Sequence, residues 1–175
     1  YAYFIYILSF LNLENENFIL LILSSQILLS SISVGIFYKI NKNFFSEKIS
    51  MFGSLLFSLF PLYLYACSQI SSISLHIFLA TLFYYYFFKI VKNKGLSSVI
   101  IFSFIAGLLI LTRREFIAIL IISSVFLFIF FKIPKKKILL IFLVTSLTIS
   151  PYLTRNFLIF EKIIIQAGFG YNVWK

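Results

Sequence analysis

The 175-residue sequence is poor in charged residues, which make up 11% of it, and it contains a single cysteine and a single histidine. Soluble domains usually carry about 25% charged residues, so a water-soluble fold of this chain would expose a large apolar surface. One cysteine, Cys67, excludes an internal disulfide and a zinc site built from cysteines. The sequence also lacks a glycine-rich phosphate loop, a Gly-x-Ser-x-Gly motif and a cluster of metal ligands, which excludes the enzyme classes that depend on these features.

Apolar residues dominate instead: 62% of the chain is hydrophobic, 21% is aromatic, and the mean hydropathy is +1.07. This composition predicts an all-α integral membrane protein, because a backbone in hydrocarbon must satisfy its own amide groups. We expect about six transmembrane helices, preceded by a short interfacial helix within residues 1–13. The predicted spans are residues 18–38, 49–67, 73–91, 96–112, 116–131 and 138–154.

The basic residues are sorted between the loops. The loops after the first, third and fifth spans hold ten of the 15 basic residues, all lysines: Lys39, Lys42, Lys48, Lys89, Lys92, Lys94, Lys132, Lys135, Lys136 and Lys137. The opposite side holds Arg113, Arg114, Arg155, Lys162 and Lys175, with four of the five acids. Because positive residues favour the cytoplasmic side, we expect the N-terminus and all three arginines to lie outside. A net charge of +10 sorted in this way argues against nucleic-acid binding.

Arginine occurs only at the ends of two apolar runs, as Arg113 and Arg114 and as Arg155. Anchoring to ordinary lipid headgroups is the simplest role, but lysine would serve that role equally well. The planar guanidinium fork matches two phosphate oxygens at once, so its selective use here predicts phosphate binding. An ion pair between Arg114 and Glu115 is the alternative for that part of the cluster.

Few other polar residues stand out. The turn that contains Gln69 and Ser72 is polar and uncharged, which suits a sugar or a helix cap equally. Gln26 and His76 lie inside predicted spans, where hydrogen bonding between helices is the usual role of such residues. Pro61 predicts a kink in the second span, and Pro151 predicts a bent or loosened helix end before Arg155. No pair of carboxylates has the arrangement of an acid–base couple.

Two stretches resemble motifs of a known family. Residues 150–157, Ser-Pro-Tyr-Leu-Thr-Arg-Asn-Phe, and residues 168–174, Gly-Phe-Gly-Tyr-Asn-Val-Trp, resemble the Pro-Trp-x-x-Arg-Asn-Tyr … Gly-Gly-Tyr-Asn-x-Trp signature of polytopic GT-C glycosyltransferases. Leu-Thr-Arg-Arg-Glu at residues 111–115 is similar to that group's Leu-Thr-Arg-Pro-Glu. The group includes protein O-mannosyltransferases and bacterial lipid A aminoarabinose transferases. In order and spacing, the resemblance covers nearly the whole chain.

The resemblance implies a GT-C-like membrane core in a multi-pass plasma membrane protein, the inner membrane in a bacterium. It implies transfer of a sugar from a polyprenyl-phosphate donor to a lipid, glycan or protein acceptor on the extracytoplasmic, periplasmic face. No further cofactor is implied within this stretch, and a divalent metal stays an open question. The residues that the resemblance implies for binding of the lipid phosphate are Arg113, Arg114, Arg155 and Asn156. Those implied to cover the sugar are Tyr171, Asn172 and Trp174. Gln69 and Ser72 are implied on the sugar or acceptor side.

The sequence also departs from the family pattern. The catalytic aspartate of the family would lie upstream of Tyr1, so we interpret the sequence as an inactive piece of a longer enzyme. Ser71 and Ser72 stand where the family often has Ser-Glu, and Arg114 replaces a proline. We expect an outer interfacial segment at 1–17, a six-helix core at 18–154 and a truncated outer loop or domain from 155 to 175. A lipid-linked saccharide transporter or flippase and a non-catalytic scaffold subunit are the alternative functions.

Overall fold

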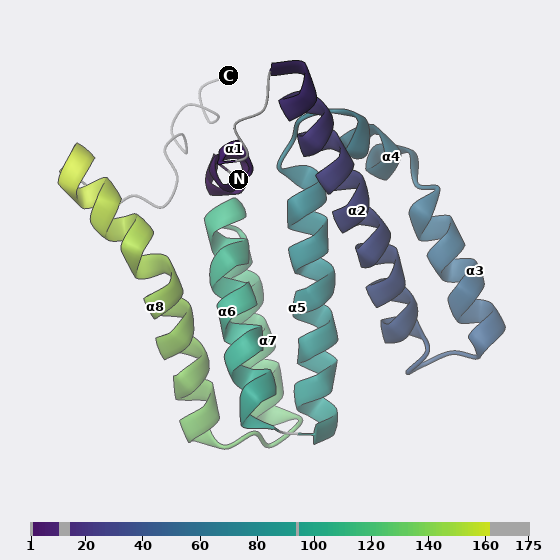
Figure 1. The fold of residues 1–175 in the computed structure, drawn as a ribbon. Coiled ribbons are helices and arrows are strands. Elements are labelled where there is room, and N and C mark those ends of the chain that lie inside the picture. The colour runs from purple at the N-terminus through teal and green to yellow at the C-terminus, as the bar shows by residue number, and fades with distance from the viewer. Residues whose placement is uncertain (1, 11–14, 94, 162–175) are drawn as a thin grey trace, which may run out of the picture. The chain divides into compact units, whose positions relative to one another are not determined.

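The computed structural model describes residues 2–10, 15–93 and 95–161, and these are almost entirely helical (Figure 1). The described residues form eight α-helices and no strand, which confirms the all-α prediction. The helices are α1 Ala2–Ser9, α2 Asn15–Asn41, α3 Glu47–Ser58, α4 Pro61–Ser68, α5 Ile73–Asn93, α6 Leu96–Thr112, α7 Phe116–Ile129 and α8 Lys135–Phe160.

Each of the six predicted spans is mostly helical, and the second is interrupted between Ser58 and Pro61. Three helices, α2, α5 and α8, are long and apolar enough to cross a membrane. The pair α3 and α4 passes the same test together but is bent by 50°, which is the geometry of a broken span or a re-entrant loop. Helices α6 and α7 are shorter and apolar, with 17 and 14 residues. These helices confirm an integral membrane protein.

The chain forms two compact units, residues 1–88 and residues 89–175. In the first unit, α2 packs against α3, α4 and α1. A hairpin joins α2 to α3, and Lys42 Nζ lies 3.4 Å from Glu47 Oε1 at its tip. The hydrogen bond to Glu47 raises the pKa of Lys42 above its usual value. Further along the hairpin, the rings of Phe37 and Phe57 stack with centroids 4.5 Å apart.

The second span breaks at the predicted proline. Helix α3 ends at Ser58, and α4 begins at Pro61, in the first helical position, where a missing N–H costs nothing. The predicted kink near Pro61 is thus confirmed, and it is a complete interruption rather than a bend in a continuous helix.

In the second unit, α6 packs along α8, and α7 connects them in the opposite direction (Figure 1). Thr145 Oγ1 donates to the carbonyl of Ser103 at 3.1 Å, and one turn further along both helices Gly107 meets Thr148. The contacts advance in the same direction along both chains, so α6 and α8 are parallel. Ile141, Thr145 and Ile149 form the buried stripe of α8, one residue per turn.

Helix α8 continues through Pro151 to Phe160, six residues beyond the predicted end of the span. Proline lacks the N–H that would bond to the carbonyl of Leu147 one turn earlier. Ser150 Oγ donates to this carbonyl at 2.9 Å, which replaces the missing bond. Arg155 and Asn156 therefore lie on α8, and the start of an outer loop or domain at residue 155 stays a prediction.

Candidate functional site

Arg113 and Arg114 lie in the three-residue turn between α6 and α7. The amide of Arg113 donates to the carbonyl of Leu109 at 2.8 Å, which ends α6. The carbonyls of Arg113 and Arg114 accept the amides of Phe116 and Ile117 at 3.2 and 3.0 Å, so α7 starts immediately. The side chain of Arg113 is exposed and that of Arg114 is half-buried. The hydrogen-bonded backbone of this turn therefore fixes the positions from which both arginine side chains extend.

Arg155 and Asn156 lie near the end of α8 and differ sharply in burial. Asn156 is 5% exposed, whereas Arg155 is exposed. Arg155 Nη1 donates to Asn156 Oδ1 at 3.4 Å. The buried amide therefore holds one edge of an exposed guanidinium, which restricts its orientation and leaves its other N–H groups available to an anion.

The register of α6 and α8 brings the two arginine positions to the same level. Arg113 lies six residues beyond Gly107, and Arg155 lies seven residues beyond Thr148, its contact on α8. At 1.5 Å per residue these are rises of about 9 and 10.5 Å. Figure 1 shows that α8 leans away from α6 at this end. The side chains of Arg113 and Arg155 therefore extend from nearly the same level along the helix axes, although the two helices diverge at this end.

The described lysines around the start of α8 lie at the other end of this helix. Lys132 precedes α8, and Lys135, Lys136 and Lys137 form its first turn. From Lys136 to Arg155 the helix rises about 28 Å, close to the hydrocarbon thickness of about 30 Å. Along this helix, the predicted sorting of arginine and lysine to opposite ends is confirmed.

Lys42 and Glu47 form the ion pair found among the described residues, and the alternative pairing of Arg114 with Glu115 stays a prediction. The same part of the chain contains no group of three metal-ligating side chains. The turn between α6 and α7 therefore presents two basic side chains, Arg113 and Arg114, next to the carboxylate of Glu115.

The predicted sugar-side residues lie apart in the sequence from the arginines. Gln69 and Ser72 flank the turn between α4 and α5 in the first unit, where Gln69 is exposed and Ser72 is half-buried. Gln26 Nε2 donates to the carbonyl of Ser71 at 2.9 Å, which confirms its predicted structural role between elements. His76 lines a cavity of about 440 Å³ beside α5. Tyr171, Asn172 and Trp174 lie outside the described residues.

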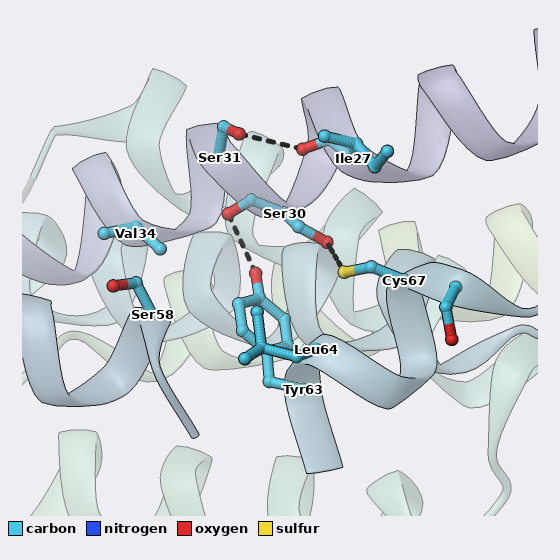
Figure 2. A pocket seen from close by; sticks show the side chains of 9 residues that line it. Ile27, Ser30, Ser31, Val34, Ser58, Tyr63, Leu64 and Cys67 are labelled. Atoms are coloured by element: carbon cyan, nitrogen blue, oxygen red, sulfur yellow. Dashed lines mark hydrogen bonds between the residues drawn. The ribbon is translucent and has the colours of Figure 1, made fainter. Parts of the chain in front are cut away.

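Sequence reasoning missed a polar network between α2 and α4. Tyr63 OH donates to the carbonyl of Ser30 at 2.8 Å, and Ser30 Oγ lies 3.0 Å from Cys67 Sγ (Figure 2). Ser74 Oγ donates to the carbonyl of Ala66 at 3.3 Å on the same side. The spacing of Tyr63 and Cys67, four residues apart on one helix face, was the available signal.

Comparison with known proteins identifies the family of the chain. The dolichyl-phosphate-mannose-protein mannosyltransferase family matches residues 1–154, which include Arg113 and Arg114 and end directly before Arg155. No curated protein and no solved structure matches the chain significantly. The family match confirms the resemblance to GT-C glycosyltransferases that the motifs indicate. The chain therefore belongs to the dolichyl-phosphate-mannose-protein mannosyltransferase family of membrane glycosyltransferases.

Proposed function

We propose that this protein transfers a sugar from a polyprenyl-phosphate donor to a lipid, glycan or protein acceptor, and that its arginine end binds the donor phosphate. The observation that carries the proposal is the common level of Arg113 and Arg155 on two packed helices. This level lies about one hydrocarbon thickness from the lysines of α8. A lipid phosphate occupies the same depth, at the boundary between hydrocarbon and headgroups.

Arginine at this position suits the chemistry of the transfer. The donor is a phosphodiester with one negative charge. The acceptor oxygen attacks the anomeric carbon and gives its proton to a general base, while the phosphate oxygen leaves with the bonding electron pair. The product is a lipid phosphate monoester, whose charge approaches −2 because phosphate monoesters have a second pKa of about 6. Guanidinium groups that bind this growing charge stabilise the transition state more than the bound donor, which accelerates the reaction.

The four site residues have different tasks in this proposal. Arg113 and Arg155 contact the phosphate directly, since both side chains are exposed. Asn156 orients Arg155 through the bond at 3.4 Å, and Arg114 adds charge from the same turn as Arg113. Fixed donors of this kind need little reorganisation during the reaction.

The arginine end faces the extracytoplasmic side of the plasma membrane in this proposal, the periplasm if the source is a bacterium. The lysine-rich loops support this orientation, because lysine and arginine accumulate in cytoplasmic loops. Tyr171, Asn172 and Trp174 follow α8 in the sequence and would contact the sugar from the arginine side. Gln69 and Ser72 would serve the sugar or acceptor in the same way.

A transporter for lipid-linked saccharides is the main competitor, and the broken span α3–α4 is the feature that favours it. Transporters of this kind use interrupted helices in corresponding positions of two repeats. In the described residues one bent pair is found, and it lies in the first unit. The second unit, which carries the arginines, has no corresponding break among its described helices, so the enzyme fits better.

The test is transfer of labelled mannose from polyprenyl-phosphate mannose by the full-length protein in membranes. A hydrogen bond to a charged group contributes about 1.5–3 kcal/mol, so Arg155→Ala should reduce transfer roughly 10- to 100-fold. Lys136→Ala removes a positive charge from the other end of the same helix and should leave transfer unchanged. Equal transfer by the two variants would remove the phosphate role from Arg155.

A further inference from the structure

The break between α3 and α4 leaves polar backbone groups without protein partners. The carbonyls of Leu56, Ser58 and Leu59 and the amide of Leu62 accept or donate no hydrogen bond within the described part of the chain. The break is not sealed from its surroundings, because Leu59 and Leu62 are 58% and 66% exposed. In hydrocarbon each such group is costly, and irregular backbone at that depth is tolerated where it lines a water-filled cavity or is buried in protein.

Helix length places these groups deep in the membrane when α3 and α4 cross it as one bent span. Lys48, in the first turn of α3, marks the polar end of this span. From Lys48 to Leu59 the helix rises about 16 Å. This is half of a hydrocarbon core of about 30 Å. Headgroups and bulk water are therefore too far away to satisfy the break directly.

A pocket of about 360 Å³ reaches the break from the side of α2. Its wall includes Ser58, the last residue of α3, whose carbonyl is one of the unpaired groups. Six of its nine lining residues carry a hydroxyl or a thiol: Ser30, Ser31, Ser58, Tyr63, Cys67 and Ser68. Figure 2 shows Ser58, Ser30, Tyr63 and Cys67 around this space. Four of these hydroxyls already donate to backbone carbonyls, and their oxygen atoms can still accept a hydrogen bond from water.

We propose that this pocket is a water-binding site inside the membrane, and that its water completes the hydrogen bonds of the α3–α4 break. One water molecule occupies about 30 Å³ of liquid, so the pocket holds on the order of ten. An acyl or isoprenoid chain would fill the same volume but offers no donor or acceptor to Ser58 or Leu62. The proposal depends on the first unit alone and holds whether or not the arginines bind phosphate.

Cysteine accessibility tests the proposal in the full-length protein in membrane vesicles. The native thiol is first removed as Cys67→Ser, and single cysteines are introduced as Ser58→Cys and Leu56→Cys. Ser58 lines the pocket, whereas Leu56, at nearly the same depth, is 54% exposed and does not line it. We expect a charged, membrane-impermeant methanethiosulfonate reagent to modify Ser58→Cys at least tenfold faster than Leu56→Cys. A neutral, lipid-soluble maleimide should modify both, which shows that both thiols are present and the variants are folded alike.

A blocking variant shows whether the reagent arrives through the pocket. Ser31→Phe narrows the pocket wall from α2, and Ile32→Phe adds the same ring to the neighbouring position outside it. Ser31→Phe should slow the charged reagent at Ser58→Cys, and Ile32→Phe should not. Modification of Ser58→Cys by the neutral reagent alone would overturn the proposal, because the pocket would then hold lipid. Equal rates at Ser58→Cys and Leu56→Cys, or equal slowing by both phenylalanines, would overturn it as well.

Discussion

A methyl group placed on Gly107 of α6 would lie 2.6 Å from Cβ and 2.8 Å from Cγ2 of Thr148 on α8. Real Cβ atoms do not approach other heavy atoms so closely, and the Thr148 side chain is stiff at its branched Cβ. The crossing of α6 and α8 therefore requires glycine at this position. The same crossing sets the register that brings Arg113 and Arg155 to one level.

Gly107→Ala should push α8 away from α6 and destabilise the second unit. Overpacking of this kind costs about 1–3 kcal/mol, and it should also weaken phosphate binding because the arginine positions shift apart. Gly35→Ala is the matched control, since nothing lies within 4 Å of its added methyl group and alanine favours the helix. Thermal unfolding in detergent measures both variants. Equal midpoints for the two would contradict the close crossing.

Ser150→Ala should destabilise α8 at Pro151. The Ser150 hydroxyl bonds to the Leu147 carbonyl at 2.9 Å, where the proline offers no N–H. Loss of this bond should cost about 0.5–1.5 kcal/mol, seen as a lower unfolding midpoint. Ser146→Ala, an exposed position one turn earlier on the same helix, should change the midpoint little. A larger effect at Ser146 would mean that the carbonyl of Leu147 does not need the hydroxyl.

Tyr63→Phe tests the network between α2 and α4. Tyr63 is 4% exposed, and its hydroxyl donates to the carbonyl of Ser30. Phenylalanine keeps the packing but leaves that carbonyl without its donor, at a cost of about 1 kcal/mol. Tyr65→Phe removes the same hydroxyl from a side chain that is 60% exposed, and it should have no measurable effect on unfolding. Equal stability of both variants would contradict the network.

Asn156→Ala should weaken phosphate binding without removing a charge. The buried amide bonds to Arg155 Nη1, so its loss frees the guanidinium to adopt other orientations. We expect polyprenyl-phosphate affinity to fall about fivefold, the equivalent of roughly 1 kcal/mol, and by less than in Arg155→Ala. Thr154→Ala, an exposed neighbour on the same turn, should bind as the unaltered protein does. An unchanged affinity in Asn156→Ala would show that Arg155 needs no support.

The apolar composition and the lysine loops predicted most of the fold, because burial in hydrocarbon leaves few alternatives to helices. The helix beyond Thr154 was missed because proline and polar residues usually end a span, whereas the Ser150 hydroxyl compensates for Pro151 here. At the site, the sequence alone was enough to single out the three arginines as candidate phosphate-binding residues. The sequence could not predict that Arg113 and Arg155 lie at the same level, since this depends on the contact between Gly107 and Thr148. The Ser30–Tyr63 network was likewise not predicted, because the spacing of Tyr63 and Cys67 indicates a shared helix face but not which helix lies opposite.

A double-mutant cycle on Arg113 and Arg155 tests most directly whether both residues bind one phosphate. The measurement is the affinity of the full-length protein for a polyprenyl phosphate in Arg113→Ala, Arg155→Ala and the double variant. If both guanidinium groups bind the same phosphate, the two losses should be non-additive, with a coupling free energy of about 0.5–3 kcal/mol. Losses that add within about 0.5 kcal/mol, or no loss in either single variant, would contradict a shared site.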